Sequence, residues 1–145
     1  MIDQKTAPYA ALLLRVGLGV MFLAHGLYLK FFVFTLAGTA QFFGSLGLPE
    51  FFAYLVFAAE TAGGIALIVG FRTRLVALAL IPVLVGAFWV HSGNGWVFSA
   101  KGGGWEYPLF LIMASVVQAL LGSGAYALTS DIGETDVVYQ AGPAE

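Results

Sequence analysis

The chain has 145 residues, of which 60% are hydrophobic and 10% are charged, and its formal net charge is −2. Charged residues make up about a quarter of a typical soluble domain, so this composition indicates an integral membrane protein and excludes a soluble globular one. An acidic balance gives nucleic acid no basic surface, and the lack of cysteine excludes disulfides and thiolate metal sites.

Four apolar stretches predict transmembrane helices. They cover residues 8–29, 51–70, 74–90 and 107–128. Each meets or approaches the ~20 residues that a helix needs to cross a ~30 Å hydrocarbon core. The first contains Arg15, which the apolar region of a signal sequence would not carry, so we expect it to be retained as a span. Pro82 predicts a kink in the third.

The sequence therefore predicts an all-α membrane protein, a four-helix bundle within a single domain at residues 1–131. Residues 30–50, between the first two spans, alternate aromatic and polar side chains and predict a short amphipathic helix at the outer membrane interface. Gly47-Leu48-Pro49 is expected to end that helix. The next outer loop, residues 92–104, is rich in glycine and predicts a flexible segment.

The orientation follows from the turn at residues 70–74, which carries Arg72 and Arg74 and is the densest positive cluster in the chain. The positive-inside rule places this turn in the cytoplasm. With four spans, both termini are then cytoplasmic, and residues 132–145 form an acidic cytoplasmic tail.

Five ionisable residues lie inside the apolar stretches or at their ends. They are Arg15, His25, Glu60, His91 and Glu106. A charge at bilayer depth costs at least ~2.5 kcal/mol, so such residues usually face the bundle interior and mark a site. The helical rise places Arg15 roughly 10 Å and Glu60 roughly 15 Å above the inner surface, which predicts an ion pair between them. The pair could belong to a site or could fix helix register.

The two histidines and Glu106 fall nearer the outer surface. Histidine and carboxylate chains form proton relays in membranes, and this arrangement suits quinone chemistry. In that hypothesis His25 and His91 hydrogen-bond the quinone oxygens, Glu60 or Glu106 exchanges protons, and Arg15 holds the Glu60 charge. Alternatively, the histidines bond to backbone carbonyls or water at the interface. A bis-histidine haem or a metal ion on His25, His91 and Glu106 is disfavoured, because no ligand spacing supports either.

A run of motifs supports a more specific interpretation. They are Arg15-Val16-Gly17, His25-Gly26, Lys30, Gly47-Leu48-Pro49, Glu60 with Gly63-Gly64, the turn at 70–74, His91, Glu106-Tyr107 and the glycine-containing ending at 122–128. In order and spacing they resemble the DoxX family of small four-helix bacterial membrane proteins, over about residues 8–131. The resemblance implies a location in the bacterial cytoplasmic (inner) membrane and a relation to the membrane subunit of thiosulfate:quinone oxidoreductase. It also implies work with quinones or with soluble redox partners.

Two functions remain open. The first is a subunit of a quinone-linked oxidoreductase, whose electrons come from a partner protein because no flavin, nicotinamide or iron–sulfur motif is present. The alternative is a non-catalytic accessory subunit of a larger respiratory or other electron-transfer complex, with glycine stripes as its contact surface. A transporter is disfavoured, because four helices without an inverted repeat provide no through-path.

Overall fold

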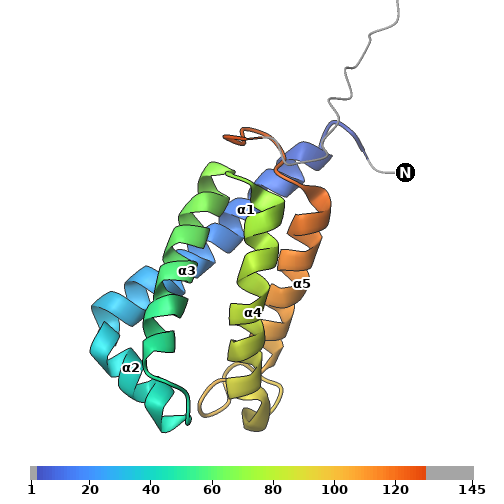
Figure 1. Cartoon of the computed structure of the whole chain (residues 1–145). Coiled ribbons are helices and arrows are strands. Elements are labelled where there is room, and N and C mark those ends of the chain that lie inside the picture. The colour runs from blue at the N-terminus through green and yellow to red at the C-terminus, as the bar shows by residue number, and fades with distance from the viewer. Residues whose placement is uncertain (1–2, 130–145) are drawn as a thin grey trace, which may run out of the picture.

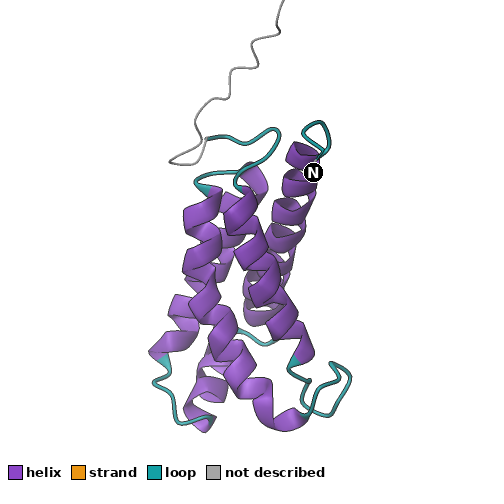
Figure 2. Ribbon diagram, turned by 90° about the vertical axis from the view of Figure 1, so that its right-hand side faces the viewer, coloured by secondary structure: helices purple, strands orange, loops and turns teal. Residues whose placement is uncertain are grey.

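The computed structural model describes residues 3–129, and every regular element among them is a helix (Figures 1 and 2). The elements are α1 (Ala7–Leu23), the π-helix η1 (Ala24–Val33), α2 (Leu36–Ser45), α3 (Phe51–Val69), α4 (Thr73–His91), the short 3₁₀-helix η2 (Ser92–Asn94) and α5 (Glu106–Leu121). The predicted acidic tail, 132–145, lies outside the described residues. The all-α prediction is confirmed.

Among residues 3–129, three helical segments are long and apolar enough to cross a membrane. They are Ala7–Val33, Phe51–Val69 and Thr73–Asn94. The fourth predicted span, 107–128, is shorter than expected, because the apolar helix covers only Glu106–Leu121. Gly122 ends it with a φ of 85°, a conformation that favours glycine and cannot continue a helix. A fourth crossing therefore stays a prediction.

The long helices pack side by side, with α1 against α3 and α5, and α4 against α3 and α5 (Figure 1). Their shared core is aliphatic, with Leu18, Leu67 and Leu80 at its centre and Phe22 beside them. The outward side chains are also apolar, and Leu13 and Leu120 are more than 70% exposed. Apolar exposure on this scale fits helices solvated by lipid rather than by water.

Glycine permits the close crossing of the antiparallel helices α1 and α3. A Cβ on Gly19 would lie 2.7 Å from the carbonyl oxygen of Gly64, and a Cβ on Gly64 would lie 2.8 Å from that of Gly19. Gly63 instead lies against Leu80 of α4. Neighbouring glycines therefore serve two different helix contacts, as small residues do in membrane bundles.

The loop that follows α5 connects the helices at one end of the molecule. We call this end of the molecule the closed end. There Ala125 N–H donates to Pro8 O at 2.9 Å, at the start of α1. Leu128 N–H donates to Val69 O at 3.0 Å, at the end of α3, and Thr129 N–H donates to Gly70 O at 3.1 Å. The loop thus joins the start of α1 to the end of α3.

At the opposite end, α2 confirms the predicted short helix between the first two spans and packs against α3 (Figure 1). Thr35 caps it by accepting a hydrogen bond from Gly38 N–H at 3.1 Å. The helix ends at Ser45 and is followed by Gly47 with a φ of 78°, as the Gly-Leu-Pro motif predicts. Its position at a membrane interface stays a prediction.

Candidate functional site

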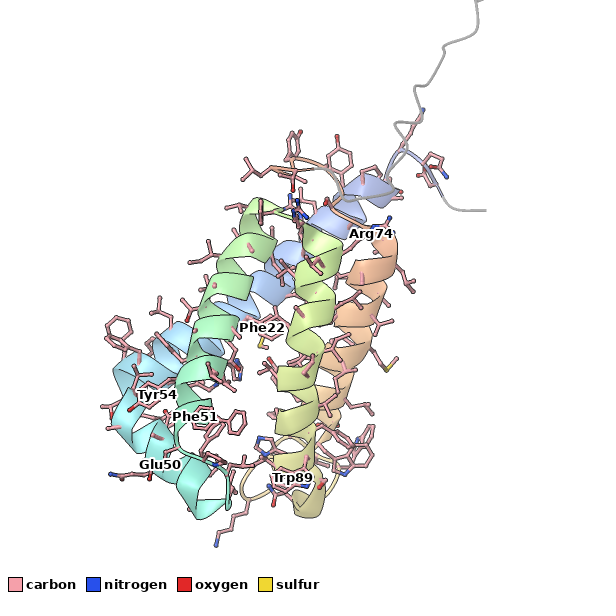
Figure 3. All side chains as sticks on the ribbon, viewed as in Figure 1. Phe22, Glu50, Phe51, Tyr54, Arg74 and Trp89 are labelled. Carbon is pink, nitrogen blue, oxygen red and sulfur yellow. The ribbon has the colours of Figure 1, made fainter. Side chains whose placement is uncertain are left out.

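A cavity of about 380 Å³ lies between the last turn of α1, η1, α2, α3, α4 and α5, away from the closed end. Two of its lining residues are labelled in Figure 3, Phe22 midway along the bundle and Trp89 near the end of α4. Most of the wall is aliphatic or aromatic. Its ionisable side chains other than Tyr107 are His25, Lys30, Glu60 and His91. The structure therefore brings three of the five predicted site residues together and adds Lys30.

A π-helix places two of these side chains. The chain runs from α1 directly into η1, and hydrogen bonding from residue i to i+5 makes residues five apart neighbours on one face. His25 and Lys30 are five apart, whereas an α-helix would separate them by roughly 140° around the axis. Ten residues is long for a π-helix, because these usually occur as single turns, often at functional sites.

Lys30 and Glu60 form a shielded ion pair. The Lys30 Nζ lies 2.6 Å from the Glu60 Oε2, and the two side chains are 17% and 8% exposed. Nζ also donates to the His25 carbonyl oxygen at 3.4 Å. Gly26 allows η1 to approach this closely, since a Cβ there would lie 2.8 Å from the Glu60 Cβ. The pair carries no net charge, which lowers the cost of its burial.

Arg15 does not pair with Glu60, and this prediction is wrong. Its Nη1 donates to Leu67 O at 3.0 Å and Ile68 O at 2.7 Å, and its Nη2 donates to Ala125 O at 2.8 Å. Arg15 therefore belongs to the closed end and does not line the cavity.

Two geometric effects separate the charges. The prediction set the ends of α1 and α3 level, but the contacts of Gly19 with Gly64 and of Arg15 with Ile68 show that α1 begins about two turns beyond the end of α3. Side chains also lean toward the N-terminus of their own helix. Because α1 and α3 are antiparallel, Arg15 leans toward the closed end and Glu60 leans away from it.

Both histidines are held through Nδ1. The Nδ1 of His25 lies 3.0 Å from Met21 O, and that of His91 lies 2.9 Å from Gly102 O and 3.2 Å from Gly103 O. The predicted alternative of bonding to backbone carbonyls is therefore correct, and it coexists with a place in the cavity wall. The His25 ring also lies 6.1 Å from that of Tyr107, whose hydroxyl donates to the Met21 sulfur.

Glu106 lies outside the cavity wall, contrary to its predicted place in the polar set. Its Oε1 accepts a hydrogen bond from Phe98 N–H at 2.7 Å and so fastens the glycine-rich loop to the first turn of α5. It also borders a separate, shallower surface hollow lined by aromatic side chains. Within residues 3–129, no group of three or more histidine, cysteine, aspartate or glutamate side chains is arranged to hold a metal ion.

Lys30 is the site residue to which the sequence gave no role. Its place in the cavity is not evident from its position at the end of the first span, because a lysine there is expected to extend toward the membrane surface. The available signal was the five-residue spacing from His25, which brings the two side chains to one face only in a π-helix.

Comparison with known proteins places this geometry in a family. The DoxX family model matches residues 10–93. A Bacillus subtilis protein named putative oxidoreductase CatD is 38% identical over 125 residues, which is 86% of this chain and 88% of the relative. The Escherichia coli inner membrane protein YqjF is 33% identical over 98 residues, which is 63% of this chain and 70% of that protein. No solved structure matches the chain.

Proposed function

The chain is a membrane protein of the DoxX family, and from that premise we propose that it is the membrane subunit of a quinone-linked oxidoreductase. The observation that carries this proposal is the cavity, with an apolar wall, two histidines and a shielded ion pair. Its volume of about 380 Å³ suits a small aromatic head group. A relative with 38% identity bears the name putative oxidoreductase, which supports redox chemistry here.

The side chains fit the needs of such a head group. A bound quinone supplies two-electron, two-proton chemistry, and a partner redox protein supplies the electrons. His25 and His91 orient the reduced form of the ring by accepting hydrogen bonds from its hydroxyls, and Glu60 exchanges protons with it. Lys30 takes the role predicted for Arg15, because it holds the Glu60 carboxylate in place at 2.6 Å. The apolar wall excludes bulk water from the protons in transit.

We further propose that the chain crosses the bacterial inner membrane four times, with both termini in the cytoplasm. The 16 residues of α5 rise about 24 Å, short of a ~30 Å core, so the interfacial Trp105 and the loop after α5 complete the crossing. The positive turn at residues 70–74 lies at the closed end, which is then the cytoplasmic end. The cavity lies toward the outer surface, with α2 along the interface.

Matched carboxylate substitutions test the proposal. We expect Glu60→Gln to lower quinone-linked electron transfer in native membranes about a hundred-fold, since proton transfer by a positioned side chain contributes on this scale. Glu106→Gln is the control, because its amide oxygen can still accept the Phe98 N–H bond outside the cavity. Equal activity of the two variants at equal membrane abundance would overturn the catalytic proposal.

A second variant separates catalysis from folding. Glu60→Gln leaves the Lys30 ammonium without its counter-ion, so Lys30→Gln with Glu60→Gln restores a neutral pair in the same place. Loss of activity in this folded double variant supports the proposed role. Full activity in the double variant, within a large complex that holds no quinone on this chain, would instead assign the chain as an accessory subunit. Native mass spectrometry of the particle extracted in mild detergent identifies that complex.

A further inference from the structure

We infer that the cavity binds the reduced, hydroxyl-bearing quinol in preference to the quinone, because its wall presents mainly hydrogen-bond acceptors. This inference rests on the proposed function and specifies which redox form the resting site recognises. It follows from which donor and acceptor atoms already form hydrogen bonds within the protein and which remain free. The residues concerned are His25, Lys30, Glu60 and His91.

The two imidazoles have their tautomers fixed by the backbone. A carbonyl oxygen can only accept, so the Nδ1 atom that contacts it must carry the proton. This holds for His25 against Met21 O and for His91 against the carbonyls of the glycine-rich loop. In a neutral ring the other nitrogen, Nε2, is then an acceptor. Neither Nε2 has a hydrogen-bond partner among residues 3–129.

The ion pair adds a further acceptor and one donor. The Lys30 ammonium has three N–H groups, of which one goes to the Glu60 Oε2 and one to the His25 carbonyl. The Oε1 atom of Glu60 has no hydrogen-bond partner in the described part of the chain. The Tyr107 hydroxyl already donates to the Met21 sulfur. The lining also includes Trp89, whose indole N–H is a donor. The cavity residues therefore carry three free acceptors, two imidazole nitrogens and a carboxylate oxygen, against two donors, one ammonium hydrogen and this indole N–H.

This balance selects between two ligands of nearly equal shape. Quinone oxygens only accept hydrogen bonds, so a bound quinone would place its oxygens against the imidazole acceptors without forming hydrogen bonds to them. Quinol hydroxyls donate and can satisfy the imidazole nitrogens. Leaving buried polar groups unpaired discriminates more strongly between ligands than a change in apolar contact does. Because the Lys30–Glu60 pair has no net charge, the site favours a neutral ligand over an anionic one.

Three short-chain ligands with one ring test the inference by isothermal titration of the full chain in detergent under anaerobic conditions. They are the quinol, the quinone and the dimethyl ether of the quinol, which keeps the ring but has no donor. We expect the quinol to bind about ten-fold or more tightly than either of the others. Equal affinity, or tighter binding of the quinone, would overturn the inference and leave the proposed function standing. Binding of none of the three would overturn both.

Variants locate the effect. His91→Phe removes one acceptor and keeps an aromatic ring, so we expect it to weaken quinol binding about ten-fold and to leave quinone and ether affinities unchanged. The retained affinity for the ether shows that the cavity has folded. His25→Phe is an independent repeat on another helix, and Glu106→Gln is the control outside the wall. A loss of affinity for all three ligands alike in both folded histidine variants would overturn the acceptor argument.

Discussion

The molecule buries a charge at each of its two ends, and the two burials differ in kind. At the closed end, Arg15 is 1% exposed and spreads its guanidinium over three backbone carbonyls from two chain segments. At the cavity, Glu60 pairs with a single lysine beside a mostly apolar wall that holds two histidines. Both charges are expensive inside a membrane. Only one of them lies beside a space that a ligand could enter.

The comparison distinguishes a buried charge that stabilises the fold from a buried charge that our proposed function uses. Backbone carbonyls are fixed by the helices that carry them, so Arg15 acts as a tie between α1, the end of α3 and the loop after α5. A side-chain partner such as Lys30 can rotate and can share its protons with a third molecule. A buried charge alone therefore does not identify a site. A buried charge with a movable partner and an adjacent cavity marks a candidate site.

The largest expected effect comes from breaking the closed end. Arg15→Ala removes three charge-assisted hydrogen bonds and takes the guanidinium donor from the half-buried carbonyls of Ile68 and Ala125. The Leu67 carbonyl oxygen keeps the Gly70 N–H at 3.1 Å. We expect a loss of about 4 kcal/mol in unfolding free energy, measured by thermal or denaturant unfolding in detergent. Leu13→Ala, two residues away at a 73% exposed position, is the control and should cost less than about 1 kcal/mol. An unfolding curve for Arg15→Ala that matches the control would contradict the structural role.

The ion pair at the cavity is expected to show the next largest effect. Lys30→Gln and Glu60→Gln should each cost about 2–3 kcal/mol, below the range for fully buried pairs because Lys30 keeps 17% exposure. The double variant should recover at least half of the summed loss, since neither charge is then left alone. A double-mutant cycle of unfolding free energies measures this coupling. Strict additivity of the two losses would show that the pair is not formed.

The crossing of η1 with α3 gives a sterically matched pair of substitutions. A Cβ on Gly26 would meet the Glu60 Cβ at 2.8 Å, whereas a Cβ on Gly17 has nothing within 4 Å. We expect Gly26→Ala to cost about 1–2 kcal/mol and to weaken ligand binding, because η1 must move away from Glu60. Gly17→Ala should cause no loss of stability, since alanine is the better helix former. Equal unfolding temperatures for the two variants would argue against the close crossing.

Much of the fold can be predicted from the apolar stretches and from the glycine and proline residues that end helices. The helices α3 and α4 begin and end within one residue of the predicted bounds, whereas α1 begins as predicted but gives way to η1 at Ala24. Gly47 and Pro49 mark the end of the short α2 region. Gly122 and Gly124 ended α5 early because both adopt positive φ, a feature that hydropathy does not register. The sequence pattern predicts the helices but not how far each is shifted along the bundle axis relative to its neighbours.

The site was less predictable, for physical reasons. Pairing Arg15 with Glu60 assumed level helix ends, and heights along an axis say nothing about the direction in which a side chain leans. Lys30 was given no role, because a helix with α geometry turns it away from His25 and the five-residue spacing alone does not predict a π-helix. The place of His25, His91 and Glu60 in the cavity wall follows from a simpler rule, since ionisable side chains in apolar spans usually face the bundle interior.

The smallest expected effect sharpens the boundary of the site at Glu106. Its carboxylate accepts the Phe98 N–H bond at 2.7 Å and lies in the first turn of α5, where a negative charge is favourable. Glu106→Gln keeps the acceptor and loses the charge, so its unfolding free energy should fall by less than about 1 kcal/mol. Glu106→Ala also leaves the N–H without its partner and should cost about 1 kcal/mol more. Neither change should alter ligand affinity measured by titration. If Glu106→Gln weakened ligand binding as much as Glu60→Gln does, the ligand site would have to include Glu106 as well as the cavity wall. Glu60 would then no longer be distinguished from Arg15 as the buried charge beside the ligand site.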